Sequence, residues 1–519
     1  MKPRALENRL FFGTLSNVVG QGVIVLAGLL VVPLIVHRVG ATDYGIWAVT
    51  VSVASLVQIV DLGVSDGLVK YVAQYVSRND RREAALFVGA ATWNYACIGA
   101  FIALVGLALA AGLPDMLGLE GHLRRVVTPL VALVAVALGI YIPSVAPLAV
   151  LRGLEQFPAL NVIRAGGALL EVVLTIPVLL LGGGIVGLAG VFLVSTVATF
   201  AASVVVVRQT APDLWEHPIR RDTARARRLL RFSVPVAFVE IAGRLQLYSD
   251  AIVIAVALPV RFVTPYNFAQ RLADGTRITT EQFVKVLLPV ATEVSSTRHR
   301  SALGSIFLTA TRLSLAIAVA VALPLILLGG PTLALWIGPE FSGHGDIVAI
   351  LAASAIFDLC LFTAAAMLQS IERHQPLARM ALAGATLNVI LSIALVGPFG
   401  IVGVALSTLI ASSGVTILFA LPYAARTLGV PLRALGRDVL LRLLVPIAVF
   451  AAVLVGGDRV LPVTSIPRLG AVVGVGLACY ALLYVAVGAG PMEKVAYRSG
   501  ARHAARWLLR PLRGAVTRA

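Results

Sequence analysis

Charged residues are scarce in this chain of 519 amino acids: Asp, Glu, Lys and Arg together make up 13% of it. A soluble protein of this length would carry about 25%. Instead, 59% of the residues are hydrophobic and the mean hydropathy is +0.94. Apolar runs long enough to cross a hydrocarbon core of about 30 Å recur along the whole sequence. The composition therefore excludes a soluble protein and predicts an all-α polytopic membrane protein.

Sequence signatures of catalysis and metal binding are also missing. The chain has no G-x-x-x-x-G-K-[ST] loop, so it is not expected to hydrolyse ATP, and it has no H-E-x-x-H pair. The three cysteines, Cys97, Cys360 and Cys479, fall inside apolar segments without metal-ligand spacing. They are interpreted as small buried side chains. We expect no enzymatic activity, no cofactor and no metal.

Basic residues outnumber acidic ones by 42 to 25, which gives a net charge of +17. Such an excess can indicate nucleic-acid binding, but no soluble basic domain carries it here. The basic residues lie mainly in alternate connections between apolar runs, as the cytoplasmic loops of a membrane protein do. The pattern favours a topology signal over a nucleic-acid interface.

Fourteen membrane spans are predicted from the apolar runs and from the Gly, Pro and charged residues that separate them. They lie near 11–36, 44–69, 84–111, 125–151, 158–181, 184–207, 232–258, 262–290, 304–329, 346–371, 376–397, 400–422, 438–456 and 468–488. An even number of spans puts both termini on one side of the membrane, and the basic connections predict that this side is the cytoplasm. Within the spans, the basic residues considered further are Arg244, Arg271, Arg277 and Lys285.

Two pseudo-symmetric lobes are expected, because a long basic connection falls near the middle of the chain. In both halves an arginine precedes the tyrosine that opens the second span by 35 residues: Arg9 before Tyr44, and Arg231 before Tyr266. Parallel repeats of this kind are a common transporter plan. The predicted parts are an N-terminal lobe (1–207), a basic cytoplasmic linker (208–231), a C-terminal lobe (232–422), two additional transmembrane helices (423–490) and a basic cytoplasmic tail (491–519).

The most polar predicted span is the eighth, which carries five charges at steps of three or four residues: Arg271, Asp274, Arg277, Glu281 and Lys285. On a helix these charges fall within an arc of roughly 120°, with Asn267 and Gln270 beside them. Their signs alternate, so the row could neutralise itself within a packed bundle. The alternative is that it lines a water-filled cavity, because such a face cannot contact lipid.

Other ionisable residues are also expected at membrane depth and should turn inward. They are Asp61, Asp66, Glu171, Glu240, Arg244, Asp250 and Asp358. At 1.5 Å per residue, Arg244 lies roughly 18 Å deep, and Arg271 and Asp274 lie at roughly 14–18 Å. Asn17 and Gln21 come within a turn or two of the same level. The sequence therefore predicts a polar centre near the midplane, where transporters bind their substrates.

The segment GATDYGIWAVTVSVASLVQIVDLGVSDGLVKYVAQ at the second span resembles the polysaccharide-biosynthesis, or Wzx-type oligosaccharide flippase, family. That family has a Gly-x-x-x-Tyr-Gly turn before this helix and an Asp-Leu-Gly followed by a basic residue after it. The matching positions are Gly40, Tyr44, Gly45, Asp61, Leu62, Gly63 and Lys70. The helix from Tyr266 to Pro289 resembles the family's eighth span.

This resemblance implies a MATE-like fold of the multidrug/oligosaccharidyl-lipid/polysaccharide exporter superfamily. It also implies a flippase that moves undecaprenyl-diphosphate-linked oligosaccharide (O-antigen, capsule or exopolysaccharide units) across the bacterial inner membrane by alternating access. The partners would be the lipid-linked substrate, membrane lipids and a polymerase or glycosyltransferases. The glycan, the coupling ion and the oligomeric state are not predicted.

Roles follow from this hypothesis for the residues at membrane depth. The diphosphate would be attracted by Arg244, Arg271 and Arg277. The sugars would be hydrogen-bonded by Asn17, Gln21, Asn267 and Gln270. Charge balance or a coupling ion would be provided by Asp61, Glu240, Asp274 and Glu281.

Three alternatives remain at the level of the sequence. An ion-coupled multidrug or cation exporter of the same fold would need a net acidic cavity, whereas the eighth span has three basic and two acidic residues. A membrane scaffold without transport activity would tolerate neutralisation of these charges. A membrane glycosyltransferase would need a longer polar loop than any present.

Overall fold

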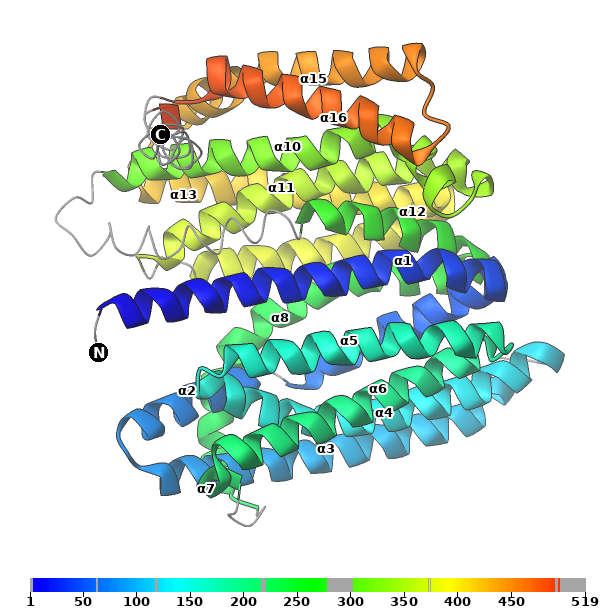
Figure 1. The fold of residues 1–519 in the computed structure, drawn as a ribbon, viewed down its shortest axis with the longest axis vertical. Coiled ribbons are helices and arrows are strands. Elements are labelled where there is room, and N and C mark those ends of the chain that lie inside the picture. The colour runs from blue at the N-terminus through cyan, green and yellow to red at the C-terminus, as the bar shows by residue number, and fades with distance from the viewer. Residues whose placement is uncertain are drawn as a thin grey trace, which may run out of the picture. The chain divides into compact units, whose positions relative to one another are not determined.

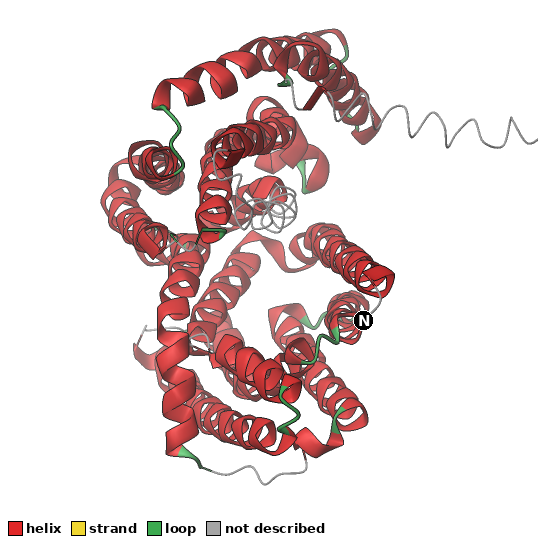
Figure 2. Cartoon of the chain, turned by 90° about the vertical axis from the view of Figure 1, so that its left-hand side faces the viewer, coloured by secondary structure: helices red, strands yellow, loops and turns green. Residues whose placement is uncertain are grey.

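The computed structural model describes residues 3–61, 64–116, 120–215, 221–277, 302–371, 373, 375–490 and 493–494. Within these ranges, only the backbone is described for residues 3–27, 29, 113, 122, 232, 234–240, 302 and 378. Every regular element in the described ranges is a helix, and they contain no strand (Figure 2). The predicted all-α class is therefore confirmed.

The chain divides into two compact units. The first contains Met1–Asn267 and Ala381–Val404, and the second contains Phe268–Met380 and Ala405–Ala519. The chain passes between the units within a helix at 263–277 and within α12 (Gln375–Gly414). The predicted lobe, linker and tail boundaries stay a prediction.

The first unit is built mainly from long helices, several of which are labelled in Figure 1. They are α1 (Pro3–Val57), α2 (Val64–Ser77), α3 (Arg81–Met116), α4 (Gly121–Gly153), α5 (Phe157–Leu180), α6 (Gly184–Thr210), the short α7 (Pro212–Trp215) and α8 (Thr223–Ala257). The 3₁₀ turns Gln58–Asp61 and Val260–Phe262 follow α1 and α8. Packing is closest between α3 and α4, and between α4 and α6, so α4 lies at the centre of this unit.

The second unit holds the remaining described helices. They are α10 (Ala302–Trp336), a 3₁₀ turn (Pro339–His344), α11 (Gly345–Gln369), a π-helical turn (Val415–Ala420), α13 (Leu421–Thr427), α14 (Leu432–Ala434), a π turn (Leu435–Leu440), α15 (Leu441–Val460), α16 (Ile466–Leu483) and a π turn (Tyr484–Gly488). One of its cores combines α10 and α11 with α15 and α16, and another combines α10 and α11 with the start of α12 and with α13.

Two of the long helices are each two predicted spans joined at a glycine. Within α1, Gly40 has φ 83° and ψ 165°, and within α12, Gly400 has φ 61° and ψ −144°. These backbone angles are accessible almost only to glycine, because a Cβ would clash with the backbone. Gly40 falls in the predicted connection between spans 1 and 2, and Gly400 is the first residue of predicted span 12.

Ten helical segments in the described residues are long and apolar enough to cross a membrane. One of them, Gln375–Thr427, covers two predicted spans. Neither α8, which carries several charges, nor the helix at 263–277 is among the ten. The molecule is a multi-pass membrane protein, and the count of fourteen stays a prediction.

The prediction of one continuous second span over 44–69 is wrong. The α-helix ends at Val57, a 3₁₀ turn runs to Asp61, and α2 begins at Val64. The Asp61 carboxylate accepts hydrogen bonds from the Ser65 backbone N–H at 3.2 Å and from the Ser65 hydroxyl at 2.7 Å. Asp61 therefore acts as a cap for the orphan N–H groups that begin α2, and a new helix starts there.

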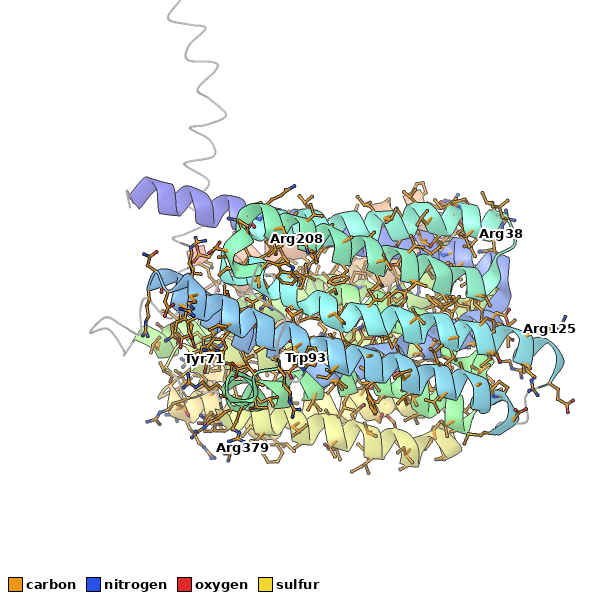
Figure 3. All side chains as sticks on the ribbon, turned by 90° about the horizontal axis from the view of Figure 1, so that it is seen from below. Arg38, Tyr71, Trp93, Arg125, Arg208 and Arg379 are labelled. Atoms are coloured by element: carbon orange, nitrogen blue, oxygen red, sulfur yellow. The ribbon has the colours of Figure 1, made fainter. Side chains whose placement is uncertain are left out.

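The first unit carries arginines toward both ends of its helices (Figure 3). Arg38 and Arg125 lie at one end of its helices, and Arg208 lies toward the other end (Figure 3). The sequence assigns Arg38 and Arg125 to connections after odd-numbered spans and Arg208 to a connection after an even-numbered one. Which end faces the cytoplasm stays a prediction.

Candidate functional site

A polar cavity of about 300 Å³ lies within the first unit. Its wall combines the end of α1 and the start of α2 with α4, α5 and α8. The lining residues are Gln58, Ile59, Asp61, Ser65, Asp66, Tyr141, Val145, Leu148, Ala149, Arg152, Arg164 and Arg244. Three arginines from three helices thus converge on one space, together with two aspartates.

Asp61 is held in this wall by three hydrogen-bond donors. Two come from Ser65, and the third is the Tyr95 hydroxyl, which donates to Asp61 Oδ1 at 2.5 Å. Tyr95 is buried in the core between α2, α3 and α4, so its position is determined by packing. The oxygens of Asp61 are consequently engaged with the protein itself.

Arg244 reaches the end of α1 from the middle of α8. Its Nη1 donates to the Ser55 carbonyl oxygen at 2.9 Å and to Gln58 Oε1 at 3.3 Å. Ser55 is in the last turn of α1, where carbonyl groups lack intrahelical partners. Both acceptors are neutral, so the positive charge of Arg244 is not cancelled by them. The side chain of Glu240, one turn earlier on α8, lies outside the described residues.

Arg152 stands in the last turn of α4, where a cation is favoured by the helix dipole. Its Nη2 lies 3.0 Å from Asp66 Oδ1, in the first turn of α2. About a third of each side chain is exposed, at 36% and 34%. A pair this accessible contributes only about 0–1 kcal/mol, so a stronger anionic partner could replace Asp66.

Arg164 lies two turns into α5 and is exposed where it lines the cavity. Among the described side chains, none supplies a carboxylate to it. The charge of Arg152 and the hydroxyl of Tyr141 are the groups that influence it electrostatically. Two guanidinium groups that face one cavity repel each other, and an anion between them would relieve that repulsion.

The arrangement suits an anion with several oxygen atoms. Arginine presents up to five donors in a planar fork and binds phosphate in a bidentate manner. Three arginines outnumber two aspartates, one of which is capped by hydroxyl and amide donors and the other paired. The cavity is therefore positive overall, and its open donors belong to Arg164 and, in part, to Arg244 and Arg152.

Two of the residues predicted for the site, Arg244 and Asp61, line this cavity together. Four others cannot be placed in it or outside it. Asn17, Gln21 and Glu240 have only their backbone described, in α1 and α8, and Glu281 lies outside the described residues, as does Lys285. Their roles stay predictions.

The rest of the predicted set lies on the helix at 263–277. Asn267 belongs to the first unit and accepts a hydrogen bond from the buried Tyr44 hydroxyl at 2.9 Å. Gln270, Arg271, Asp274 and Arg277 belong to the second unit and are all partly buried. The guanidinium of Arg277 lies 5.6 Å from the centre of the Phe362 ring, a cation–π contact.

Arg152 and Arg164 were not selected from the sequence as site residues. Arg164 lies within α5, and Arg152 lies in the last turn of α4. A signal was present for Arg164, because it stands six residues inside the predicted span 158–181. At 1.5 Å per residue that is roughly 9 Å of depth.

Comparison with solved structures identifies the fold. It is similar to a multidrug resistance MATE family transporter of the MOP superfamily in an inward-facing conformation, with a TM-score of 0.67 and 17% identity over 82% of this chain and 96% of that one. It is also similar to a MOP superfamily transporter from Pyrococcus furiosus, described as having a binding pocket of reverse polarity, with a TM-score of 0.58 and 16% identity over 82% of this chain and 95% of that one. The fold is MATE-like, as expected.

Sequence comparison identifies the family. Residues 10–295 match the family described as polysaccharide biosynthesis protein, and the chain belongs to it. A relative in Haloferax volcanii, named "Probable low-salt glycan biosynthesis flippase Agl15", is 23% identical over 195 residues, which is 38% of this chain. The match spans 41% of that relative's length.

Proposed function

We propose that this protein is a flippase for a lipid-linked oligosaccharide, and that Arg152, Arg164 and Arg244 bind the diphosphate of its head group. The observation that carries the proposal is the convergence of these three arginines on one cavity inside a membrane-spanning unit. Charges at such depth are costly unless they face water or a partner, so their presence points to a polar ligand. Membership of the polysaccharide biosynthesis family and the similarity to a probable glycan biosynthesis flippase support a glycan as that ligand.

The chemistry of a diphosphate fits the wall of the cavity. Arg164 has open donors, and Arg152 can exchange its weak pair with Asp66 for a more highly charged partner. Arg244 is anchored through neutral acceptors, so it keeps its charge for a ligand. Tyr141 and Gln58 add a hydroxyl and an amide to the same wall. Phosphate oxygens could therefore be bound from α4, α5 and α8 at once.

The proposal extends to the identity of the substrate and of the membrane that it crosses. The substrate would be an undecaprenyl-diphosphate-linked repeat unit of O-antigen, capsule or exopolysaccharide, moved across a bacterial inner membrane by alternating access, with both termini in the cytoplasm. In the second unit, Arg271 and Arg277 would attract the diphosphate and Gln270 would bind sugar, as would Asn17, Gln21 and Asn267 of the first unit. Charge balance would come from Asp274, Glu240 and Glu281, and a polymerase or glycosyltransferases would be partners.

A cation exporter of the same fold is disfavoured by the state of the two aspartates in the cavity. Asp61 already accepts three hydrogen bonds, and Asp66 is paired with Arg152. A cationic drug would meet three arginines and no uncommitted carboxylate among the residues that line this cavity. The cavity therefore favours an anionic head group.

The direct test is Arg164→Gln in cells that depend on this protein for glycan assembly. Each charged hydrogen bond contributes about 1.5–3 kcal/mol, so assembly should fall by about tenfold to a hundredfold at equal protein level. Arg164→Lys should recover part of the activity, because it keeps the charge but loses the fork. The matched control is Arg125→Gln, an exposed arginine at a helix end, which should leave assembly unchanged.

Normal glycan assembly in Arg164→Gln cells would contradict the proposal. So would a gain of drug susceptibility in cells without the protein, accompanied by normal surface glycan. The double variant Arg271→Ala with Arg277→Ala extends the test to the second unit. If only that double variant loses activity, the head group is bound there and not among the three cavity arginines.

A further inference from the structure

A second, larger cavity of about 690 Å³ lies in the same unit, between α1, α3, α4 and the end of α8. Every side chain that lines it is apolar except Thr50. The Thr50 hydroxyl donates to the Ile46 carbonyl oxygen at 2.8 Å, so it is satisfied by its own helix. Water in such a space would find no hydrogen-bonding partners, whereas a hydrocarbon chain needs none and would contact the apolar walls. We call this space the apolar cavity.

The apolar cavity adjoins the polar one along two helices. At the end of α1, Val57 and Val60 line the apolar cavity while Gln58, Ile59 and Asp61 line the polar cavity. Along α4, residues 123–138 line the apolar cavity and residues 141–152 line the polar one. The two cavities therefore follow each other along the helix axis, and from Leu130 to Arg152 the distance is roughly 33 Å.

The apolar cavity is an open groove rather than a sealed void. Several of its side chains are well exposed, among them Phe101 at 66% and Val53 at 45%. An elongated chain could enter such a groove from the side and leave it again into the bilayer. An exposed apolar surface of this extent in a membrane protein would otherwise be covered by lipid.

An anionic site that continues into an apolar groove has the polarity of an amphiphile. We propose that the apolar cavity binds the hydrocarbon chain of the same lipid whose diphosphate is bound by Arg152, Arg164 and Arg244. This inference rests on the proposed function for its head group. The first unit then binds the hydrocarbon chain of the lipid as well as its diphosphate head group, so the lipid carrier contributes to recognition. A lipid with its head at the Arg152 end of α4 would have its chain directed along the helix toward Leu130.

The experiment compares two soluble probes on the full-length protein in nanodiscs: inorganic pyrophosphate, which has only the head, and farnesyl diphosphate, which adds a short hydrocarbon chain. Wild type should bind farnesyl diphosphate at least tenfold more tightly than pyrophosphate. Val53→Trp should fill the groove and reduce this ratio below threefold, with pyrophosphate affinity unchanged. Val105→Trp, from the opposite wall, should do the same and serves as a second variant if the first does not fold.

Leu104→Trp is the matched control. Leu104 neighbours Val105 on α3 and is 68% exposed, but it does not line the groove, so its ratio should equal that of wild type. A ratio that stays at tenfold in both groove variants would overturn the inference. It would also be overturned if native mass spectrometry showed a copurified phospholipid that the groove variants lose without a change in the ratio. Failure of pyrophosphate to bind wild type would instead refute the head-group site.

Discussion

Arg312 of the second unit and Arg164 of the first both lie within apolar helices, but their surroundings are opposite. The Arg312 side chain is 4% exposed, and its Nη2 lies 2.8 Å from Glu493 Oε1. Its Nη1 donates to the Asp438 carbonyl oxygen at 2.7 Å. Arg164 is exposed to a cavity, and no described carboxylate pairs with it. Each of the three nitrogens of the Arg312 guanidinium donates to the protein, whereas the Arg164 guanidinium has donors that face the cavity.

The difference separates a structural arginine from one suited to bind a ligand. Glu493 is itself saturated, because the Gly490 N–H and the Tyr484 hydroxyl donate to its Oε2 at 2.6 Å and 3.3 Å. This network ties the segment after α16 to α10 and to the π turn before α15. Because each nitrogen of Arg312 already donates to the protein, this guanidinium is not suited to bind a substrate. Charge within a span therefore does not identify a binding site unless the unused donors face open space.

Among the variants that test this difference between Arg312 and Arg164, Glu493→Gln is expected to have the largest effect on stability. It leaves the Arg312 charge buried without its counter-ion, which costs about 3–5 kcal/mol. The thermal unfolding midpoint in detergent should fall markedly, whereas Arg164→Gln should change the free energy of unfolding by only about 0.5 kcal/mol or less. The double variant Arg312→Met with Glu493→Met should restore most of the loss, because it removes both charges. Equal destabilisation by Glu493→Gln and Arg164→Gln would break the distinction.

Much of the fold was predictable because helix breaks in lipid depend on few residues. Gly40 lies in a predicted connection and Gly400 at the start of a predicted span, and their backbone angles explain why the chain turns there. The end of the α-helix at Val57 and the 3₁₀ turn Gln58–Asp61 were not predicted, because Asp61 interrupts an otherwise apolar run and its capping of α2 depends on Ser65 hydrogen bonds. An aspartate within a span can either face a cavity or start a new helix. Asp61 does both.

The site was less predictable than the fold. Arg244 and Asp61 could be selected because a charge inside an apolar run is visible in the sequence. Arg164 was not selected, since basic residues near span ends usually act as topology signals. That α4, α5 and α8 bring their arginines to one cavity is a result of helix packing. Helical periodicity describes one helix at a time and does not predict which faces meet.

A smaller effect is expected for Asp66→Asn, which frees Arg152 within the polar cavity. Removing the competing carboxylate should raise the affinity for pyrophosphate by about threefold to fivefold, in keeping with a partly exposed pair of about 1 kcal/mol or less. Asp213→Asn is the control, because Asp213 pairs with Arg81 at 2.9 Å at an exposed position outside the cavity. Isothermal titration calorimetry measures both. An unchanged or weaker affinity in Asp66→Asn would show that Arg152 is structural, like Arg312.

The smallest effect concerns Arg225, which is paired like Arg312 but remains within reach of water. Arg225 Nη2 lies 2.7 Å from Glu83 Oε2, and Arg225 Nη1 donates to the carboxylate of Asp222, the N-cap of α8. Hydrogen bonds from the backbone and side chain of Arg225 lower the pKa of Asp222 below its ordinary value. The unfolded segment therefore takes up a proton first as the pH falls. The stabilisation is complete above the ordinary pKa of about 3.9 and is lost as the pH falls through the lowered pKa.

Hydrogen exchange of the first turn of α8, corrected for intrinsic rates, should show this loss as weaker protection at pH 3 than at pH 5. The difference should correspond to about 1 kcal/mol or less, the usual contribution of an N-cap. Asp222→Asn keeps a capping oxygen but cannot titrate, so its protection should depend far less on pH. If wild type and Asp222→Asn lose protection alike, the Asp222–Arg225 pair does not stabilise this turn. The pairing of Arg225 would then rest on Glu83 alone.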